Sequence, residues 1–405
     1  MKRHQAGLGF IFVTLFIDIL GFGLIVPILP QLIASLSHGN VAAAARYYGW
    51  FLAVYGAMQF VASPVLGSLS DQWGRRPVLL LSLFTTGIDY IVMAVAPTVG
   101  WLFVGRTISG ITGASFTAAN AYIADVSPPE KRAQNFGLVG GAFALGFILG
   151  PAIGGLLGEI GPRVPFMAAA GLALVNWLYG FFVLPESLAV ENRRVFSWRR
   201  SSPIASFGIL ARFPIVLGLT VATVLSGLGQ QALQSTWVLY NSYRFRWTSA
   251  QNGLSLAAVG LLAGIVQAGL MRTLVARFGE KRLVLIGLGS SASSLALYGM
   301  ATAGWMMYAI LIVGAMGFVG GPVIQGLISK QYGPDEQGAA QGALSGLVSL
   351  TGIVGPLVST ALFGYFVSKA APVRVPGAAF FFGAVLSFSG FVVAAIALRA
   401  RPIKS

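Results

Sequence analysis

Apolar residues fill most of this chain in runs of about 20, and short polar stretches separate these runs. A helix of about 20 apolar residues crosses the ~30 Å hydrocarbon core of a bilayer, whereas an outer-membrane barrel would show segments of about ten residues with alternating polarity. The pattern therefore predicts an all-α membrane protein with twelve transmembrane helices. These helices cover about residues 8–33, 47–69, 77–96, 100–124, 135–157, 165–184, 213–240, 251–272, 282–301, 305–329, 340–367 and 377–398.

One long polar interruption, at 185–212, divides the predicted helices into two groups of six. It carries five Arg and no run of spanning length, so we interpret it as a cytoplasmic linker. Within it, 203–212 has the length of a short interfacial helix. The predicted domains are an N-terminal half at 1–184 and a C-terminal half at 213–405. We expect the N-terminal half to handle protons and the C-terminal half to shape a substrate cavity.

A weak internal repeat supports this division. Gly74 matches Gly279, and the Gly-Pro pair at 150–151 matches the pair at 355–356, both at an offset of 205. Carriers are often built from parallel repeats about an axis along the membrane normal, with the substrate between them near the midplane. The sequence thus predicts two pseudo-symmetric six-helix halves.

Composition excludes a soluble globular protein. The chain is 56% hydrophobic and 9% charged, with a mean hydropathy of +0.80, whereas soluble domains carry roughly a quarter of charged residues. No Cys and only two His are present, so we expect no metal site, and a gradient-driven carrier needs no cofactor. The partners that we expect are the lipid bilayer, protons and a small-molecule substrate, with a monomeric chain.

The net charge of +15 would suit nucleic acid, but its distribution favours a topological explanation. Of the 26 Lys and Arg, nineteen fall in the two termini and the loops on one side of the predicted bundle, six fall in the other loops, and one lies in a span. An excess of Lys and Arg marks cytoplasmic loops. We therefore predict a cytoplasmic (inner) membrane protein with both termini in the cytoplasm and no nucleic-acid partner.

Asp18 and Asp89 are the acidic residues that fall well inside predicted spans. A carboxylate at bilayer depth costs several kcal/mol by some scales, so such residues usually serve a function. Proton coupling is the simplest function for both. The alternative for Asp18 is a structural acid bonded to helix backbone or to a Gln, and Asp89 has Tyr90 beside it for a bond within the bundle. Arg106, also inside a span, either lowers the proton affinity of a nearby acid or extends outward to the membrane surface.

Amides and aromatic rings gather in the seventh predicted span. Gln231 and Gln234 share a helix face, and Trp237 follows one turn later. With Gln325 from the tenth span, they suit an amphipathic ligand in a mostly apolar cavity. Hydrogen bonding between helices would explain the same Gln residues equally well.

The loop between the second and third spans reads GSLSDQWGRR at 67–76. Gly67 and Gly74 allow a tight connection, while Asp71, Arg75 and Arg76 can form charge-assisted bonds across the cytoplasmic face or to a helix terminus. The arginines could also act only as topological signals. The pattern resembles the loop signature of the major facilitator superfamily, in which this loop latches the two halves in one state.

Two further motifs resemble the same superfamily. RTISGITGA at 106–114 is similar to its fourth-helix pattern, and GFILGPAIGG at 146–155 is similar to the fifth-helix motif of its antiporters. In the second motif, one face of the helix has no side chains, because its residues there are glycines, so a partner helix can lie close. These residues are Gly146, Gly150 and Gly154. Pro151 permits a bend. The resemblance implies antiport, whereas plain helix packing would explain the glycines alone.

Longer stretches resemble the tetracycline/proton antiporters of that superfamily. They include LFIDILGFGLIVPILP at 15–30 and AVYGAMQFVASPVLG at 53–67. The resemblance implies that Asp18 and Asp89 are intramembrane acids, Gln59 a cavity residue and Asp125 a gating charge. Those exporters tend to carry a His and an Asp where this chain has Ala263 and Ser291. The substrate therefore does not follow from the resemblance.

The function that these features favour is a proton-driven antiporter that exports a drug-like amphipathic compound, of tetracycline or multidrug type, by alternating access. A proton symporter that imports a small organic nutrient is the alternative. An intramembrane enzyme is disfavoured because the spans contain no paired His, Cys nucleophile or His-Glu motif.

Overall fold

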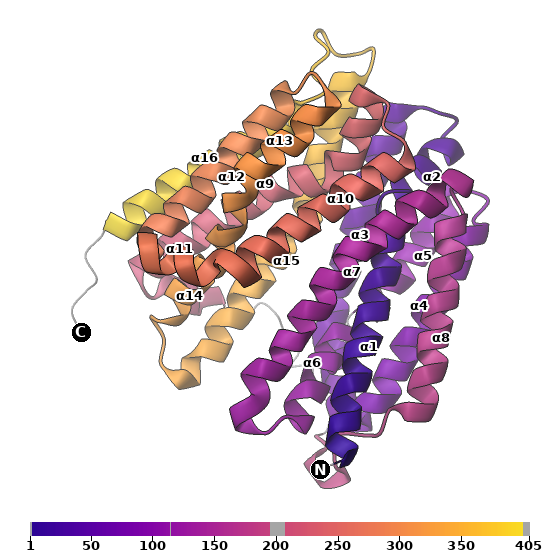
Figure 1. The fold of residues 1–405 in the computed structure, drawn as a ribbon, viewed down its shortest axis with the longest axis vertical. Helices are drawn as coiled ribbons and strands as arrows, with labels where there is room; N and C mark the ends of the chain where they lie inside the picture. Colours follow the sequence, from indigo (N-terminus) through magenta and orange to yellow (C-terminus); the bar gives the residue numbers. More distant parts are fainter. Residues whose placement is uncertain (1, 114, 195–206, 400–405) are drawn as a thin grey trace. The chain divides into compact units, whose positions relative to one another are not determined.

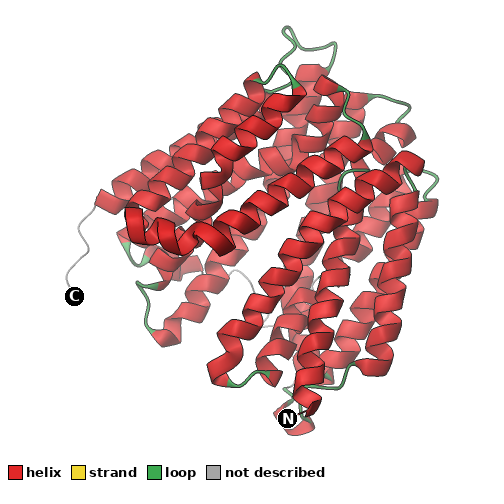
Figure 2. Cartoon of the chain, in the orientation of Figure 1, coloured by secondary structure: helices red, strands yellow, loops and turns green. Residues whose placement is uncertain are grey.

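The computed structural model describes residues 2–113, 115–194 and 207–399, and every regular element in these ranges is a helix (Figures 1 and 2). The first predicted span is broken into α1 (Lys2–Ile25) and α2 (Leu29–Leu36), which meet at an angle of 43°. Pro27 lies in the break and Pro30 in the first turn of α2. Proline lacks the backbone N–H that would continue a helix, and its fixed φ suits a helix start.

The remaining helices follow the apolar runs closely. Up to the linker they are α3 (Val41–Trp73), α4 (Arg75–Val95), α5 (Val99–Thr112), α6 (Ser115–Val126), α7 (Arg132–Ile160) and α8 (Val164–Val183). After it they are α9 (Pro214–Phe245), α10 (Ser249–Gly264), α11 (Met271–Phe278), α12 (Glu280–Met300), α13 (Gly304–Gly314), α14 (Gly320–Ser329), α15 (Pro334–Val367) and α16 (Ala378–Arg399). A π-helical segment, η4 (Ile265–Leu270), joins α10 to α11, and a 3₁₀ segment, η5 (Ala315–Val319), joins α13 to α14.

Among the described residues, ten helices are long and apolar enough to cross a membrane, and the bent pair α1–α2 would make eleven. The fourth predicted span, 100–124, falls on α5 and α6, of 14 and 12 residues, which are each too short to cross alone. An all-α membrane fold is thus confirmed, while the count of twelve stays a prediction.

The linker is only partly described. Residues 185–194 contain a short 3₁₀ turn, η2 (Val190–Asn192), and the chain resumes with another, η3 (Phe207–Ala211). Of the predicted interfacial helix at 203–212, residues 203–206 lie outside the described part of the chain, and η3 covers most of the rest. In the described part, Arg194 N–H donates to the carbonyl of Asp71 at 3.0 Å, which ties the linker to the last turn of α3.

Two compact units make up the chain, and their boundaries differ from the predicted halves. The first contains 1–39, 54–202 and 247–260, and the second contains 40–53, 203–246 and 261–405. Helices α3 and α10 are therefore each shared between the units. The division into halves at 184 and 213 remains a prediction about evolutionary repeats, and each unit is described below by itself.

Packing in the first unit centres on α1 and α4. Helix α1 packs against α7 and α8, and α4 packs against α5 and α8. Their shared interior contains the buried side chains of Phe10, Leu15, Leu79, Tyr122 and Ile123. These apolar contacts hold the polar residues of α1 and α4 at fixed positions.

In the second unit, α9 packs against α15 and α16, and α12 packs against α16, η5 and α14. The interior contains the buried side chains of Leu219, Leu283, Val319, Ile324 and Leu344. Outside the spans, the Tyr332 hydroxyl donates to the carbonyl of Ile209 at 2.7 Å, and burial raises the pKa of this phenol.

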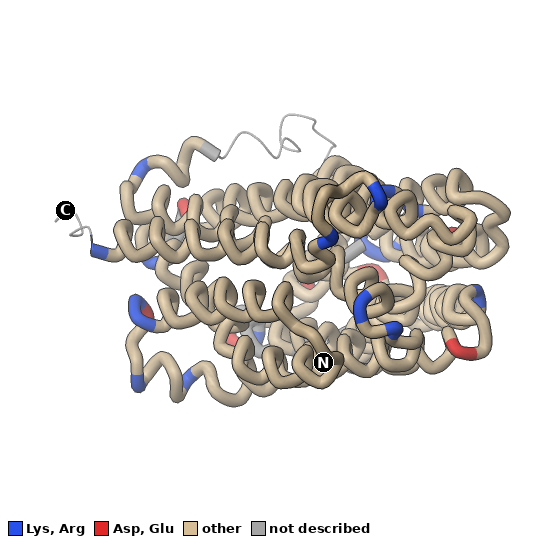
Figure 3. The backbone as a smooth tube through the Cα atoms, turned by 90° about the horizontal axis from the view of Figure 1, so that it is seen from above, with Lys and Arg blue, Asp and Glu red and all other residues tan. Residues whose placement is uncertain are grey.

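The predicted repeat has a counterpart in backbone geometry. Gly74 and Gly279 both precede a helix with left-handed dihedrals, φ 105° with ψ 162° and φ 72° with ψ 156°. This region is essentially restricted to glycine. Pro151 and Pro356 both lie inside helices, in α7 and α15. Charged residues are sparse along the chain trace (Figure 3), as the low charged fraction requires.

Candidate coupling and gating sites

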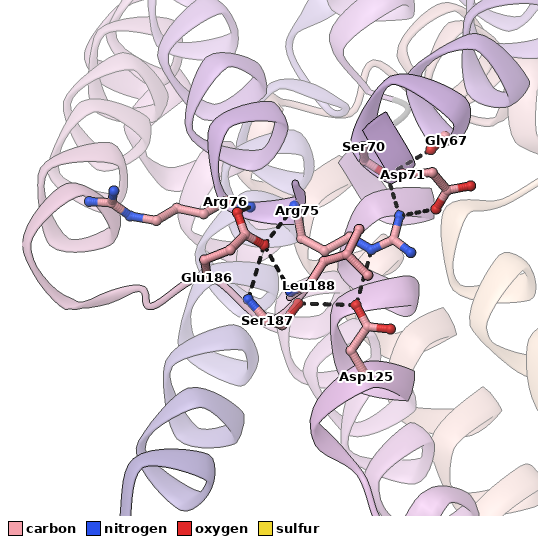
Figure 4. A network of polar contacts seen from close by, with 9 residues as sticks. All are labelled: Gly67, Ser70, Asp71, Arg75, Arg76, Asp125, Glu186, Ser187 and Leu188. Atoms are coloured by element: carbon pink, nitrogen blue, oxygen red, sulfur yellow. Dashed lines mark hydrogen bonds and ion pairs between the residues drawn. The ribbon is translucent and has the colours of Figure 1, made fainter. Parts of the chain in front are cut away.

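The residues of the predicted gating motif form an ionic network around Arg75, where α3 ends and α4 begins (Figure 4). Its Nη1 atom lies 2.5 Å from Asp71 Oδ1 and donates to Ser70 Oγ at 2.6 Å, while its Nε donates to Asp125 Oδ2 at 3.1 Å. Ser70 in turn donates to the carbonyl of Gly67 at 2.8 Å. The guanidinium is buried, so these charge-assisted bonds are worth more than surface ion pairs. Gating residues predicted from α3, α4 and α6 thus meet at one cation.

Glu186, which the sequence analysis missed, completes this network. Its Oε1 accepts hydrogen bonds from the backbone N–H of Arg75 at 2.9 Å and of Ser187 and Leu188 at 3.0 Å each, and its Oε2 accepts one from Arg76 N–H at 3.2 Å. The first turn of a helix exposes unpaired N–H groups and favours negative charge. Glu186 therefore caps α4 and ties the segment after α8 to the start of α4.

Gly74 is required at this helix start for two reasons. Its φ of 105° disfavours any side chain, and a Cβ added there would overlap the Glu186 carboxylate.

The side chain of the neighbouring Arg76 does not join this network. Its Nη2 donates to the carbonyl of Phe181 at 2.8 Å, and its guanidinium lies 5.9 Å from the centre of the Phe181 ring. Ser187 Oγ donates to Asp125 Oδ2 at 3.1 Å and so links the capping segment to the Arg75 network.

A cavity of about 220 Å³ lies among the helices of the first unit. Asp18, Gln59 and Arg106 all line it, so the structure brings three of the predicted residues to one space. Tyr55 and Tyr90, which we did not single out as site residues, lie on the same wall. Gln59 Nε2 donates to the carbonyl of Gly113 at 3.4 Å. The cavity therefore joins an acid, a cation, an amide and two phenols.

Asp89, the second acid predicted to couple protons, does not line this cavity. It is fully buried one layer behind the wall, where the cavity residue Ser109 donates a hydrogen bond to its Oδ2. Its other oxygen, Oδ1, has no hydrogen-bond partner among the described residues. A buried carboxylate oxygen without a partner is costly. Tyr90, the alternative partner, faces the cavity instead.

Arg106 is buried, and its predicted effect on the proton affinity of a nearby acid stays a prediction. Its side chain is 2% exposed, and its guanidinium lies 4.9 Å from the centre of the Tyr55 ring. It is also within electrostatic range of Asp89. An Arg that extended to the membrane surface would be more exposed, so Arg106 belongs to the buried charge cluster.

The glycine motif of α7 contacts α1, the helix that carries Asp18. A Cβ at Gly150 would lie 2.7 Å from the Cα of Gly23, and one at Gly154 would overlap the carbonyl of Leu24. Gly146 meets Ile19 in the same way, and Pro151 lies against Gly23. Backbones can approach this closely only where side chains are absent. The motif therefore sets the position of α1.

The predicted substrate residues of the second unit separate into two groups. A cavity of about 610 Å³ lies there, and Gln325 lines it together with Ser291. Gln231, Gln234 and Trp237 are not among its lining residues. Trp237 is buried, with its ring 5.2 Å from that of Tyr298 in an edge-on contact, and Gln231 packs against Gly355. Their role in binding stays a prediction.

Comparison with known proteins agrees with this architecture. The family model described as Major Facilitator Superfamily matches residues 11–272 and 219–405. The crystal structure of the nucleoside transporter NupG is similar with a TM-score of 0.78 and 13% sequence identity, over 99% of this chain and 100% of that one. At this identity the likeness concerns the fold.

Relatives with higher sequence identity show to which family within the superfamily the chain belongs. The chain is 42% identical to the tetracycline resistance protein, class C, of Escherichia coli, over 90% of this chain and 91% of that protein. It is 38% identical to the class D protein of Salmonella ordonez, over 86% and 87% of the two chains. The chain therefore belongs to the Major Facilitator Superfamily and, within it, to the family of the tetracycline resistance proteins. It is a multi-pass membrane transporter of small molecules and not an enzyme.

Proposed function

We propose that this transporter is a proton-coupled antiporter that exports a tetracycline-type amphipathic compound by alternating access, driven by the proton gradient without a cofactor. The relatives named as tetracycline resistance proteins support the substrate class. The resemblance of residues 146–155 to the fifth-helix motif of the superfamily's antiporters supports antiport.

The observation that carries the proposal is the position of Asp18. This acid lies in a transmembrane helix and on the wall of a cavity, next to a buried cluster that contains Arg106 and, behind Ser109, Asp89. Protonation would remove its charge from an apolar environment, which changes the stability of the conformation that exposes it. A proton and a substrate that shift one conformational equilibrium in opposite directions are exchanged across the membrane.

We infer further that the protein is a monomer in the bacterial cytoplasmic membrane with both termini in the cytoplasm. Nineteen of its 26 Lys and Arg fall in the termini and the loops on that side, which agrees with the positive-inside rule. Reaction of single cysteines introduced near each terminus with an impermeant thiol reagent tests the orientation, because the chain has no Cys of its own.

The function is tested in everted membrane vesicles, whose lumen corresponds to the outside of the cell. We expect an acid lumen to drive uptake of labelled tetracycline, and a protonophore to abolish it. Asp18→Asn cannot carry a proton, so gradient-driven uptake should fall at least about tenfold while exchange of labelled for unlabelled substrate persists. Glu191→Gln, at an exposed position of η2, serves as the matched control and should keep the wild-type rate.

Two results would contradict the proposal. If an acid lumen lowers the tetracycline content of the vesicles, the protein is a symporter. If Asp18→Asn retains wild-type gradient-driven uptake, Asp18 is not part of the coupling site, and the same measurement on Asp89→Asn then decides whether the buried acid carries the proton alone.

A further inference from the structure

Ser109, on α5, connects the buried acid of the first unit to the cavity. It is one of the residues that line the cavity, and its hydroxyl group donates a hydrogen bond to Oδ2 of Asp89 on α4. Asp89 itself is fully buried and does not line the cavity. A proton that reaches the cavity is therefore separated from the carboxyl group of Asp89 by the side chain of this serine.

The hydrogen bond of Ser109 differs from those of its neighbours on α5. Thr107 Oγ1 donates to the carbonyl of Phe103 at 2.9 Å, and Thr112 Oγ1 bonds in the same way, at 3.0 Å, to the carbonyl four residues before it. Bonds of this kind, back to the same helix, are common for hydroxyl side chains inside helices. Ser109 instead donates across to another helix, so its hydroxyl group is committed to Asp89.

Helix α5 also positions the second oxygen of the carboxyl group. Gly105 lies four residues before Ser109 and so on the same helix face. A Cβ added at Gly105 would lie 2.5 Å from Asp89 Oδ1, so the missing side chain leaves room for this oxygen. Among the described residues, Oδ1 has no hydrogen-bond partner. One turn of α5 thus holds the carboxyl group with its bonded oxygen, Oδ2, towards the serine.

We propose that Ser109 is a proton relay, whose hydroxyl group passes protons between water in the cavity and Asp89. This inference rests on the proposed function and adds the route by which the second acid exchanges protons. The cavity has a volume of about 220 Å³ and is lined by Asp18 and Arg106, so it has the room and the polar groups that water needs.

The relay is balanced at each atom. Protonated water in the cavity gives a proton to Ser109 Oγ, while the hydroxyl proton of Ser109 moves to Asp89 Oδ2. One O–H bond breaks at the water and one forms at Asp89, and at Ser109 one forms as the other breaks, so the serine stays neutral. A hydroxyl group suits this step because it donates and accepts hydrogen bonds at once.

A proton delivered in this way also affects the wall of the cavity. The titratable and charged groups within electrostatic range of Asp89, among the described residues, are Arg106, Tyr55 and Tyr90. All three line the cavity together with Asp18. Neutralising Asp89 leaves the positive charge of Arg106 less balanced, and a nearby positive charge favours the charged form of an acid. The relay thus links the protonation of the buried acid to the environment of Asp18.

The test measures how fast Asp89 takes up and releases a proton in the purified full-length protein. After a rapid change of pH, infrared difference spectra follow the carbonyl band of the protonated carboxyl group. All samples carry Asp18→Asn to remove the signal of the other acid, and a band that disappears when Asp89→Asn is added belongs to Asp89. We expect Ser109→Ala to slow both uptake and release at least about tenfold, and Ser109→Thr, which keeps a hydroxyl group, to stay within about threefold of the parent.

The two rates separate a relay from a purely structural hydrogen bond. Loss of a bond to the charged carboxylate shifts the equilibrium between its charged and neutral forms, so it changes the ratio of the two rates. Loss of a relay slows uptake and release by the same factor, because both cross the same barrier. Thr107→Val removes a hydroxyl group of α5 that bonds to its own helix, so this control should keep both rates.

A second pair of variants covers the case in which Ser109→Ala does not elute as a single species in gel filtration. Ser109→Thr and Ser109→Val introduce side chains of nearly equal shape that differ in the hydroxyl group. The relay requires that the Val variant exchange protons at least about tenfold more slowly than the Thr variant does.

The outcomes separate this inference from the proposed function. If Ser109→Ala takes up protons at the parent rate, the serine is a structural partner and the relay is wrong. The absence of any band from Asp89 overturns the relay as well. Neither result affects the proposed function, which gradient-driven uptake of tetracycline by the wild-type protein decides. A wild-type protein without such uptake overturns the proposed function, while the rates of proton exchange at Asp89 still decide the relay.

Discussion

Gly74 and Gly279 offer a matched pair of substitutions that isolates the contribution of the Glu186 cap. Both residues precede a helix with similar left-handed dihedrals, so an alanine should cost about 1–3 kcal/mol of backbone strain at either site. Their surroundings differ. A Cβ at Gly279 would meet nothing within 4 Å, while one at Gly74 would overlap the Glu186 carboxylate.

The expected difference follows from the bonds that Glu186 makes. Gly74→Ala must displace a carboxylate that accepts four backbone hydrogen bonds, two of them from the first turn of α4. Loss of a helix cap costs about 0.5–2 kcal/mol. Glu186 is exposed, so water compensates some of its other bonds. We therefore expect Gly74→Ala to destabilise the protein by about 1–2 kcal/mol more than Gly279→Ala does.

A double-mutant cycle with Glu186→Ala provides the decisive measurement. Free energies of unfolding are measured in mixed detergent micelles from the loss of helical circular dichroism. In the Glu186→Ala background the alanine at position 74 no longer meets a carboxylate, so its cost should fall to that of Gly279→Ala, with an interaction energy of about 1–2 kcal/mol. Additive effects of Gly74→Ala and Glu186→Ala would refute the cap, as would equal costs of the two glycine substitutions in the wild type.

Two further substitutions test the remaining contacts. Arg75→Lys keeps the charge but loses the planar guanidinium that reaches Asp71 and Asp125 together. About 1.5–3 kcal/mol of charge-assisted hydrogen bonding should be lost, and tetracycline uptake should slow. An unchanged uptake rate in vesicles would show that the network has no gating role. Gly154→Ala presses a methyl group against the backbone of α1 and should lower the free energy of unfolding by about 1–3 kcal/mol. Gly140→Ala is the control on the same helix, because a Cβ there meets nothing within 4 Å, and it should be neutral or stabilising. Equal free energies of unfolding for the two variants would contradict the close contact.

Much of the architecture could be predicted because a chain crosses a lipid bilayer mainly as apolar helices of about 20 residues. The length of the apolar runs placed nearly every helix. The sequence match of Gly74 with Gly279 corresponds to a shared backbone conformation that only glycine adopts readily. Gly150 could be recognised as a close-contact position for the same reason: a residue without a side chain in a helix implies a neighbour. The break at Pro27 was not predicted, since proline is tolerated inside membrane helices.

Side-chain partners were harder to predict because they depend on the helix that lies opposite. Glu186 follows an apolar span and precedes a basic linker, and this position beside Pro185 could have marked it as a cap. Asp89 lies inside a helix as predicted, but its partner Ser109 could not be predicted, because it belongs to another helix and is 20 residues away in sequence. Trp237 packs on Tyr298, which no periodicity in α9 indicates.

The glycine face between α7 and α1 has a mechanical consequence. At Gly150 and Gly154 the two backbones are in direct contact, so no side chain lies between them that could turn aside if α1 shifted. At Gly146 the side chain of Ile19 occupies the space left by the missing Cβ. Asp18 directly precedes Ile19 on α1, so this contact holds its carboxyl group at one height along α7.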